Sequence, residues 1–132
     1  MDLEILKIAS NTENHKILKN HTHIFKLKNS MCGDEMEIAL KVVKDNIIDF
    51  GYQCKSCVYC QASVSLLSRS SINNSTINIK NLLKIAETFS ENRNVDFPKE
   101  WSVFSKIFNK KNILRKECLL LPFKTLKEAL NS

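Results

Sequence analysis

The feature that most constrains this fold is a change of hydrophobic period near residue 57. Before it, hydrophobic and polar residues alternate in MEIALKVV (36–43) and in IIDFGYQ (47–53), with a Lys-Asp-Asn turn between the two stretches. A period of two is typical of strands that bury one face, so we expect two antiparallel strands here. The residues of the second strand expected to face the core are Ile48, Phe50 and Tyr52. After residue 57 the spacing becomes helical.

The rest of the chain predicts one more strand and several helices. HIFKLK (23–28) alternates like a strand, and LEILKIA (3–9) is expected to form a short helix. Further helices are expected over 58–70, after a cap at Ser75 or Thr76, around Trp101 to Phe108, and at the end of the chain, where Pro122 indicates a start at or after Cys118 or a bend. Strands followed by helices predict an α+β fold, a small antiparallel sheet of about three strands covered by helices.

Length and composition indicate one ordinary globular domain. The chain has 132 residues, 43% of them hydrophobic and 26% charged, which is enough for a core without disulfides. We expect a single domain over 1–132, with a short helix and polar segment in 1–21, the strands in 22–53 and the helices in 57–132. No apolar run long enough for a membrane span and no secretory signal stand out, so we expect a cytoplasmic protein.

Positive charge is concentrated in the last third of the chain. Residues 99–132 hold eight Lys or Arg against three acids, whereas residues 1–98 hold twelve against eleven. A basic segment favours an acidic partner, either a protein or a nucleic acid. Aromatic residues are not interleaved with the basic ones as in a stacking surface, so a solvated lysine-rich helix surface is the favoured interpretation.

The cysteines indicate a metal site rather than disulfides. An odd number, five, without an export signal points to free thiols. Cys32 and Asp34 flank Gly33, which permits the backbone to aim both side chains at one point. Cys57 and Cys118 each stand where a loop meets a predicted helix start, where the helix dipole favours a thiolate. Three thiolates and one carboxylate suit tetrahedral zinc or iron in a cluster, and we expect this site at one end of the sheet.

This ordered set resembles the U-type iron–sulfur cluster assembly scaffold family, which comprises IscU, SufU and the N-terminal domain of NifU. The resemblance rests on Cys32-Gly33-Asp34, on Cys57 before a helix that runs into Ala62-Ser63, and on Cys118 opening the last helix. It covers roughly residues 22–130 and implies a NifU N-terminal-like domain. The long interval between Cys57 and Cys118, Glu117 before Cys118, and Arg115 three residues before it resemble the SufU branch most.

The resemblance implies a function in iron–sulfur cluster assembly. Cys32 would accept sulfane sulfur from a cysteine desulfurase of the SufS kind, which requires an ionised and accessible attacking thiol. Alternatively, Cys32, Asp34, Cys57 and Cys118 would hold a transient Fe–S cluster for delivery to apo Fe–S proteins or carriers, or hold Zn²⁺. Gly33 and Arg115 would support the site, the latter by offsetting its negative charge. Whether the chain is a sulfurtransferase-like carrier or a non-enzymatic scaffold stays open.

Several residues depart from the family pattern or admit other interpretations. Ser56 stands where the family has glycine, and Cys54 and Cys60 have no family counterpart. A ferredoxin-like loop at Cys54, Cys57 and Cys60 would need a fourth cysteine followed by proline, which is missing. Cys60 is expected to be a buried thiol, and Cys54 either a core thiol or a neighbour able to relay sulfur.

Other side chains also admit two interpretations, and a different class of function fits part of the pattern. His21 and His23 could form a metal pair on one strand face but are expected to be solvated side chains, and Asp34 could merely cap a turn. The alternative function is a structural-zinc module whose basic last third docks on nucleic acid or protein, with no membrane contact. Nucleic acid is the less expected partner because no recognisable binding motif is present.

Overall fold

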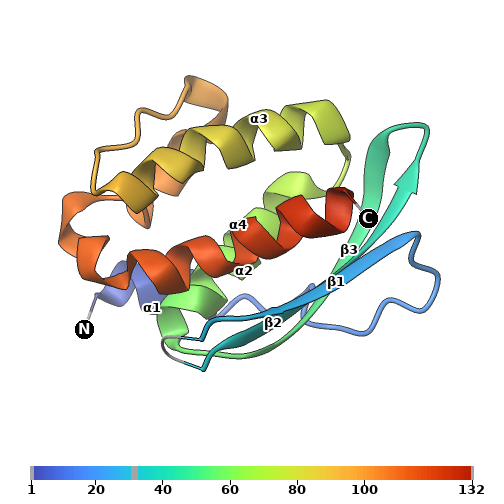
Figure 1. The fold of residues 1–132 in the computed structure, drawn as a ribbon, viewed down its shortest axis with the longest axis horizontal. Helices are drawn as coiled ribbons and strands as arrows, with labels where there is room; N and C mark the ends of the chain where they lie inside the picture. The colour runs from blue at the N-terminus through green and yellow to red at the C-terminus, as the bar shows by residue number, and fades with distance from the viewer. Residues whose placement is uncertain (1, 31–32, 132) are drawn as a thin grey trace.

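The protein is an α+β fold in which helices cover one face of a four-stranded antiparallel sheet (Figure 1). The computed structural model describes residues 2–30 and 33–131. The strands lie in the order β1-β2-β3-β4, and their bounds are β1 His23–Lys28, β2 Glu35–Val43, β3 Asn46–Lys55 and β4 Asn74–Ser75. The predicted fold class is therefore confirmed, and the expected three strands are extended by the two-residue β4.

The described residues also form four α-helices and three 3-10 helices. The α-helices are α1 Leu3–Ala9, α2 Val58–Ser71, α3 Thr76–Ala86 and α4 Lys116–Leu130, and the 3-10 helices are η1 Glu87–Glu91, η2 Lys99–Lys106 and η3 Lys110–Arg115. Helix α4 packs on β1 and β2 and also contacts α2 and α3. Figure 1 shows α4 directly above the sheet and α3 farther from it. The packing of α4 against α2 places the start of one helix beside the start of the other.

The hydrophobic core lies between the sheet and the helices. Met36, Ile38 and Leu40 alternate along β2 and are fully buried, as their period of two predicts. The prediction for β3 is wrong at Ile48, which is 46% exposed, whereas Ile47 is fully buried. The cause is a β-bulge: Lys41 pairs with Asp49 and Val42 with Ile47, which leaves Ile48 as the extra residue and reverses the alternation there.

Local signals account for most helix starts, with two differences. Ser75 caps α3, and its Oγ accepts a hydrogen bond from the Asn78 N–H at 3.1 Å. The helix predicted around Trp101 is a 3-10 helix, η2. The last helix begins at Lys116, two residues before Cys118, so it contains Pro122. The ring of Pro122 cannot donate the usual hydrogen bond to the preceding turn, and the helix tolerates it among buried residues.

The segment before β1 runs along β3. It lies at the part of the strand edge that does not pair with β4. The Tyr52 N–H donates to the Asn14 carbonyl at 3.1 Å, and the Asn14 side chain donates to Ser68 Oγ in α2 at 3.0 Å. Gly51 permits this close approach, because a Cβ there would lie 2.7 Å from the Lys16 carbonyl oxygen. The segment covers a strand edge that would otherwise expose its backbone groups.

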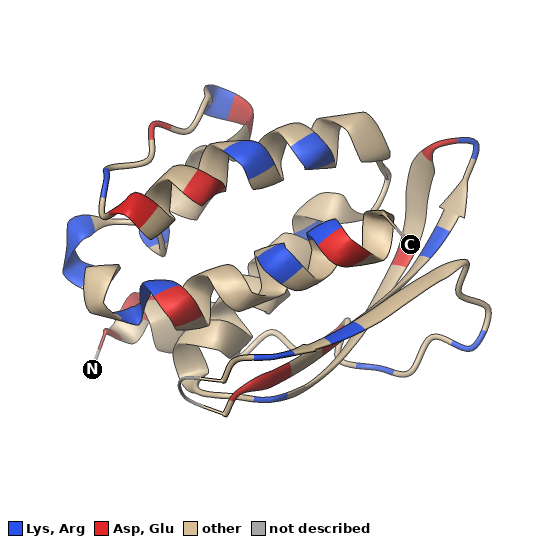
Figure 2. Cartoon of the chain, in the orientation of Figure 1, with Lys and Arg blue, Asp and Glu red and all other residues tan. Residues whose placement is uncertain are grey.

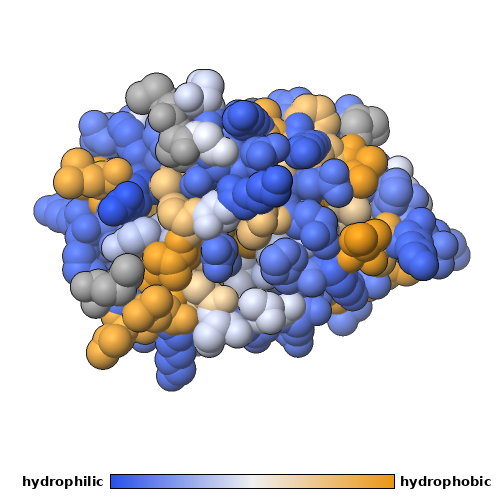
Figure 3. All heavy atoms as spheres, turned by 90° about the horizontal axis from the view of Figure 1, so that it is seen from below, coloured by the Kyte–Doolittle hydropathy of each residue, from blue (hydrophilic) through white to orange (hydrophobic). Residues whose placement is uncertain are grey.

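Charged residues on the helical side are interspersed by sign (Figure 2). Four lysines of the basic last third form ion pairs, three of them with acids outside this segment, for example Lys106 with Glu4 at 3.2 Å and Lys127 with Glu87 at 3.0 Å. The face seen from the sheet side is mostly hydrophilic, with separate hydrophobic groups (Figure 3). In the described part of the chain, no helix has the length and apolar character needed to cross a membrane.

Candidate metal centre

The β1–β2 loop places Asp34 at one end of the sheet. The Gly33 N–H donates to the Asn29 carbonyl, and the Asn29 N–H donates to the Asp34 carbonyl, both at 2.8 Å. Gly33 has φ +79, and a Cβ at this position would meet nothing within 4 Å. Glycine is therefore favoured here by the backbone conformation rather than by space. The predicted ligand and sulfur acceptor Cys32 lies outside the described residues.

The end of β3 leads into α2 and places Cys57. This cysteine is the N-cap residue of α2, as expected from the sequence. The Gln61 side chain donates to the Ser56 carbonyl at 2.9 Å and holds the approach to the helix in place. Further along α2, the buried Ser63 hydroxyl donates to the Leu119 carbonyl of α4 at 2.6 Å. This bond ties the first half of α2 to the residue that follows Cys118.

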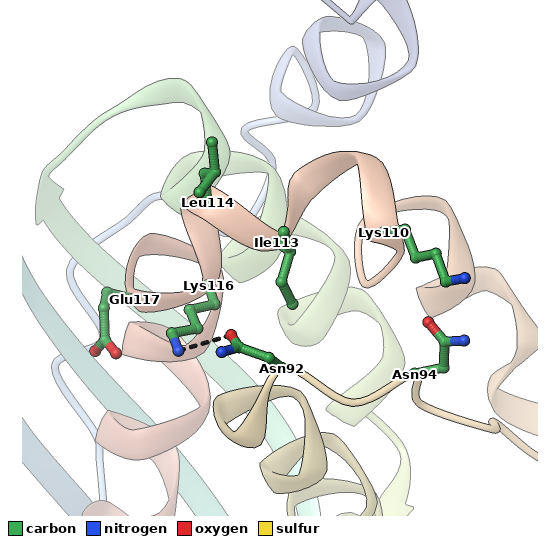
Figure 4. A pocket seen from close by; sticks show the side chains of 7 residues that line it. All are labelled: Asn92, Asn94, Lys110, Ile113, Leu114, Lys116 and Glu117. Carbon is green, nitrogen blue, oxygen red and sulfur yellow. Dashed lines mark hydrogen bonds between the residues drawn. The ribbon is translucent and has the colours of Figure 1, made fainter.

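Cys118 lies in the first turn of α4 and is only 8% exposed. The start of this helix is fixed from two sides. The Arg115 guanidinium stacks over the Tyr59 ring of α2, 5.2 Å from its centroid. The Lys116 ammonium donates to Asn92 Oδ1 at 2.8 Å, as Figure 4 shows, and to the Ser90 carbonyl at 3.2 Å.

A surface cavity lies beside this junction of η3 and α4. Its volume is about 690 Å³, and its lining includes Asn92, Asn94, Lys110, Ile113 and Lys116. In Figure 4 the Ile113 side chain points toward the η1–η2 loop and Leu114 points away from it, in keeping with the 95% exposure of Leu114. None of the three clustered site residues lines this cavity.

Asp34, Cys57 and Cys118 come together in space although 84 positions of sequence separate the first from the last. One ligand atom from each, a carboxylate oxygen and two Sγ atoms, lies within 4.8 Å of the others. Asp34 Oδ2 is buried and meets no hydrogen-bond partner among the described residues. An unpaired buried carboxylate oxygen is costly, and a metal ion would satisfy it. The donor set therefore fits a zinc or iron ion.

The two other cysteines of the 54–60 stretch lie close to this group. Cys60 is fully buried, as expected, and burial raises the pKa of its thiol. Burial also raises the pKa of the half-buried Cys54, while the Ser56 hydroxyl lowers it. The negative charge of Asp34 raises both pKa values further.

Some candidates from the sequence have other described contacts, and one contributor does not follow from the sequence. His21 Nδ1 is 2.9 Å from the Leu18 carbonyl oxygen and His23 Nδ1 is 2.8 Å from Thr22 Oγ1, at exposed positions. The described contact of Arg115 is with Tyr59 rather than with a site carboxylate or thiol. The sequence does not predict the hydrogen bond from Ser63 to α4, because a serine inside a helix carries no signal of which carbonyl it meets.

The fold and the site define an α+β protein with a group of cysteine and aspartate side chains at the end of an antiparallel sheet that could hold a metal ion. The family model for the NifU-like N-terminal domain matches residues 3–107. The chain belongs to this family, as the resemblance predicted. The match ends before Arg115 and Cys118, so the last ligand of the candidate site lies beyond it.

Individual relatives extend the similarity over nearly the whole chain. The iron–sulfur cluster assembly scaffold protein IscU of Thermotoga maritima is 35% identical over 126 residues, which cover 96% of this chain and 89% of that protein. An uncharacterized protein of Borreliella burgdorferi is 31% identical over 122 residues, 90% of this chain and 82% of that one.

Solved structures share the fold. A scaffold protein for the SUF system from Fervidobacterium islandicum superposes with a TM-score of 0.89 at 24% identity, covering 98% of this chain and 96% of that one. The N-terminal part of a NifU-like protein from Brucella abortus gives 0.85 at 20% identity, covering 98% and 91%. At these identities the similarity concerns the fold.

Proposed function

We propose that this protein acts in iron–sulfur cluster assembly and holds a transient cluster with Cys32, Asp34, Cys57 and Cys118. The observation that carries the proposal is the convergence of Asp34, Cys57 and Cys118, whose ligand atoms lie within 4.8 Å of one another. The family membership and the curated scaffold relative support the same function. The cluster is cargo, which the protein receives and passes on.

Asp34 is the ligand that makes release possible. A carboxylate binds the iron of a cluster more weakly than a thiolate does, so it leaves more readily. The β1–β2 loop supplies this ligand, whereas Cys57 and Cys118 are fixed to helix starts. We infer that Asp34 keeps the cluster labile enough to be transferred to an apo Fe–S protein or a carrier.

Cys32 is proposed as the acceptor of sulfane sulfur from a cysteine desulfurase. In the sequence it stands next to Gly33 and two residues before Asp34. When a zinc ion is bound instead of a cluster, it would hold the site thiols deprotonated. The resemblance to SufU in Arg115 and Glu117 favours a SufS-like desulfurase as the partner. We also propose a cytoplasmic location.

The alternative, a structural-zinc module with a nucleic-acid surface, is not favoured. Lys106, Lys111, Lys124 and Lys127 are paired with carboxylates, so half of the eight basic residues in 99–132 are neutralised locally. A binding surface for phosphates would keep such charges available. The family membership also argues for cluster assembly.

The decisive experiment combines metal analysis with a desulfurase assay. Purified protein is analysed for zinc and iron, and the rate of a cysteine desulfurase is measured with and without it. We expect stimulation by the wild type and none by Cys32→Ser. Full stimulation by this variant would overturn the acceptor assignment.

Cluster lifetime tests the role of Asp34. A cluster reconstituted anaerobically on Asp34→Ala should decay more slowly than on the wild type, followed by its visible absorption. Glu37→Ala, a carboxylate removed from the same strand region but outside the cluster of ligands, is the matched control and should leave the lifetime unchanged. Equal lifetimes for all three proteins would contradict the proposed role.

A further inference from the structure

The two edges of the sheet differ in what covers them. The edge of β3 is covered by β4 and by the segment around Asn14, whereas β1 is the outermost strand on the other side. In the described part of the chain, no strand pairs with the free edge of β1. Figure 1 shows this strand with α4 above it. An uncovered strand edge presents backbone N–H and C=O groups that can pair with an added strand.

The pairing of β1 with β2 determines which backbone groups the free edge presents. The Asn29 N–H donates to the Asp34 carbonyl, and the same register continues along the two strands. Hydrogen-bonded and non-hydrogen-bonded pairs alternate in antiparallel strands, so every second residue of β1 directs its N–H and C=O away from β2. These residues are Ile24, Lys26 and Lys28. They form a site at which a further strand can bind.

A groove lies along this edge on the helical side of the sheet. Its volume is about 690 Å³, within the range of ordinary ligand pockets, about 300–1,000 Å³. Its lining includes the half-buried Phe25 and Leu27 of β1 and the apolar side chains of Leu83, Leu120 and Phe123 from the helices. Both sheet residues belong to β1, so the groove opens at the free edge. Every second side chain of an added strand would enter it.

The outer face of the same edge is basic. Lys26 and Lys28 lie opposite Glu37 and Glu35 of β2, and the Lys26 ammonium is 3.4 Å from the Glu35 carboxylate. Figure 2 shows basic positions on β1 beside acidic positions on β2. Opposite charges on neighbouring strands stabilise the pairing, and like charges destabilise it. A strand added to β1 should therefore carry acidic residues opposite the two lysines.

A second copy of this chain does not meet this requirement. When two copies of β1 pair along the whole edge formed by Ile24, Lys26 and Lys28, the Lys26 side chains of the two copies lie opposite each other. Lysines on an edge strand are a common means of preventing such self-association. The charge of the edge therefore disfavours its own copy and favours an acidic segment of another protein.

We propose, building on the function proposed above, that the β1 edge and its groove bind an extended segment of the apo protein that receives the cluster. The segment adds a strand to β1. Its hydrophobic residues enter the groove, and the acidic residues between them face Lys26 and Lys28. In this mode of recognition the backbone hydrogen bonds provide affinity and the alternate side chains provide specificity.

The position of β1 relative to the metal centre indicates the recipient as the source of the segment. The loop that follows β1 supplies Asp34, the ligand whose departure is proposed to release the cluster. A recipient held on β1 is therefore attached to the strand that leads to this ligand. Cys57 and Cys118, in contrast, are held by the helix starts.

The test measures the binding of a synthetic peptide to the whole chain. The peptide has about seven residues, close to the length of an ordinary strand, and valine alternates with glutamate in it. Amide hydrogen exchange is followed by NMR on isotopically labelled protein. Exchange should slow at Ile24, Lys26 and Lys28, whose N–H groups face the free edge, and should stay unchanged at Phe25 and Leu27. Absence of binding, or binding without this alternation, would overturn the strand addition.

Matched controls test the charge and the backbone separately. A peptide with lysine in place of glutamate should bind about tenfold more weakly, and equal affinities would overturn the acidic occupant. Lys28→Gln should weaken binding of the glutamate peptide about two- to fivefold, while Lys41→Gln, on the same face of β2, should leave it unchanged. Lys26→Pro removes an N–H of the free edge and should abolish binding, at a position where an edge strand tolerates proline. Melting temperatures confirm that the variants are folded.

Two activity assays identify the source of the segment. The glutamate peptide should slow cluster transfer from the loaded protein to an apo-ferredoxin and should leave the stimulation of a cysteine desulfurase unchanged. Unchanged transfer, or loss of the stimulation instead, would overturn the assignment to the recipient. Self-association of the chain with protection of the same amides would identify a second copy as the occupant. All these results leave the proposed function standing, whereas a chain that binds the peptide but neither assembles a cluster nor stimulates a desulfurase would overturn that function alone.

Discussion

The hydrogen bond from Ser63 to Leu119 offers a sharp test of how the two helices form the metal centre. The Ser63 Oγ and the Leu119 carbonyl oxygen are 2.6 Å apart, and Ser63 is fully buried. Replacing Ser63 by alanine removes the bond and leaves part of a buried carbonyl unpaired, which should lower the free energy of unfolding by about 1–2 kcal/mol. For a chain of this size this corresponds to a fall in melting temperature of about 4–8 °C.

The same change should also weaken metal binding. The bond fixes α2 against the residue next to Cys118, so its loss should misalign Cys57 and Cys118. Groups that position ligands typically contribute ten- to hundredfold to metal affinity, and we expect about a tenfold loss in Ser63→Ala. Zinc affinity can be measured by competition with a chelating dye, and stability by thermal unfolding of the metal-free protein.

Ser71 provides a matched control in the same helix. Its hydroxyl is also fully buried and donates to a carbonyl, that of Leu67, at 2.7 Å. This bond stays within α2 and lies roughly 20 Å along the helix from Cys57. Ser71→Ala should therefore lower the melting temperature by a similar amount without changing zinc affinity. Equal zinc affinities for the two variants would refute the idea that the Ser63 bond positions the ligands.

Two further predictions concern β3. Gly51→Ala should destabilise the fold by about 1–3 kcal/mol, because the new Cβ would lie 2.7 Å from the Lys16 carbonyl oxygen; an unchanged denaturation midpoint would contradict this packing. Burial raises the pKa of Tyr52 to about 12 from its usual 10.0. The unfolded chain then loses the Tyr52 proton first, so stability should fall as the pH rises from about 10 to 12, by about 2 kcal/mol. Tyr52→Phe should lack this part of the alkaline decline, and an identical pH profile for both proteins would refute it.

The fold was largely predictable because its signals are local. The alternation in 36–53 and the helical spacing after Cys57 reflect which faces are buried, and Ser75 marks a helix start by its hydrogen-bonding chemistry. The error at Ile48 has a different origin. A bulge depends on how two strands pair, and the segment IIDF allows either isoleucine to face inward until the pairing with Lys41 and Val42 is set.

The site was predictable only in part. Gly33 and the positions of Cys57 and Cys118 near helix starts follow from the chain itself. That these groups face one another depends on the packing of α2 against α4, and the resemblance to a known family supplied that expectation. Residues that act through packing, such as Ser63, and the neighbourhood of Cys54 and Ser56 emerge only from the assembled structure.

Substitutions in the β2–β3 turn could make the protein more stable. Lys44 and Asp45 have φ values of 52 and 63, a left-handed conformation that suits asparagine and glycine better. This turn lies at the far end of β2 from Asp34, roughly 30 Å away. An Asn-Gly pair at these two positions should raise the melting temperature and leave the metal content unchanged. Destabilising substitutions of the ligand cysteines could then be studied in this more stable protein.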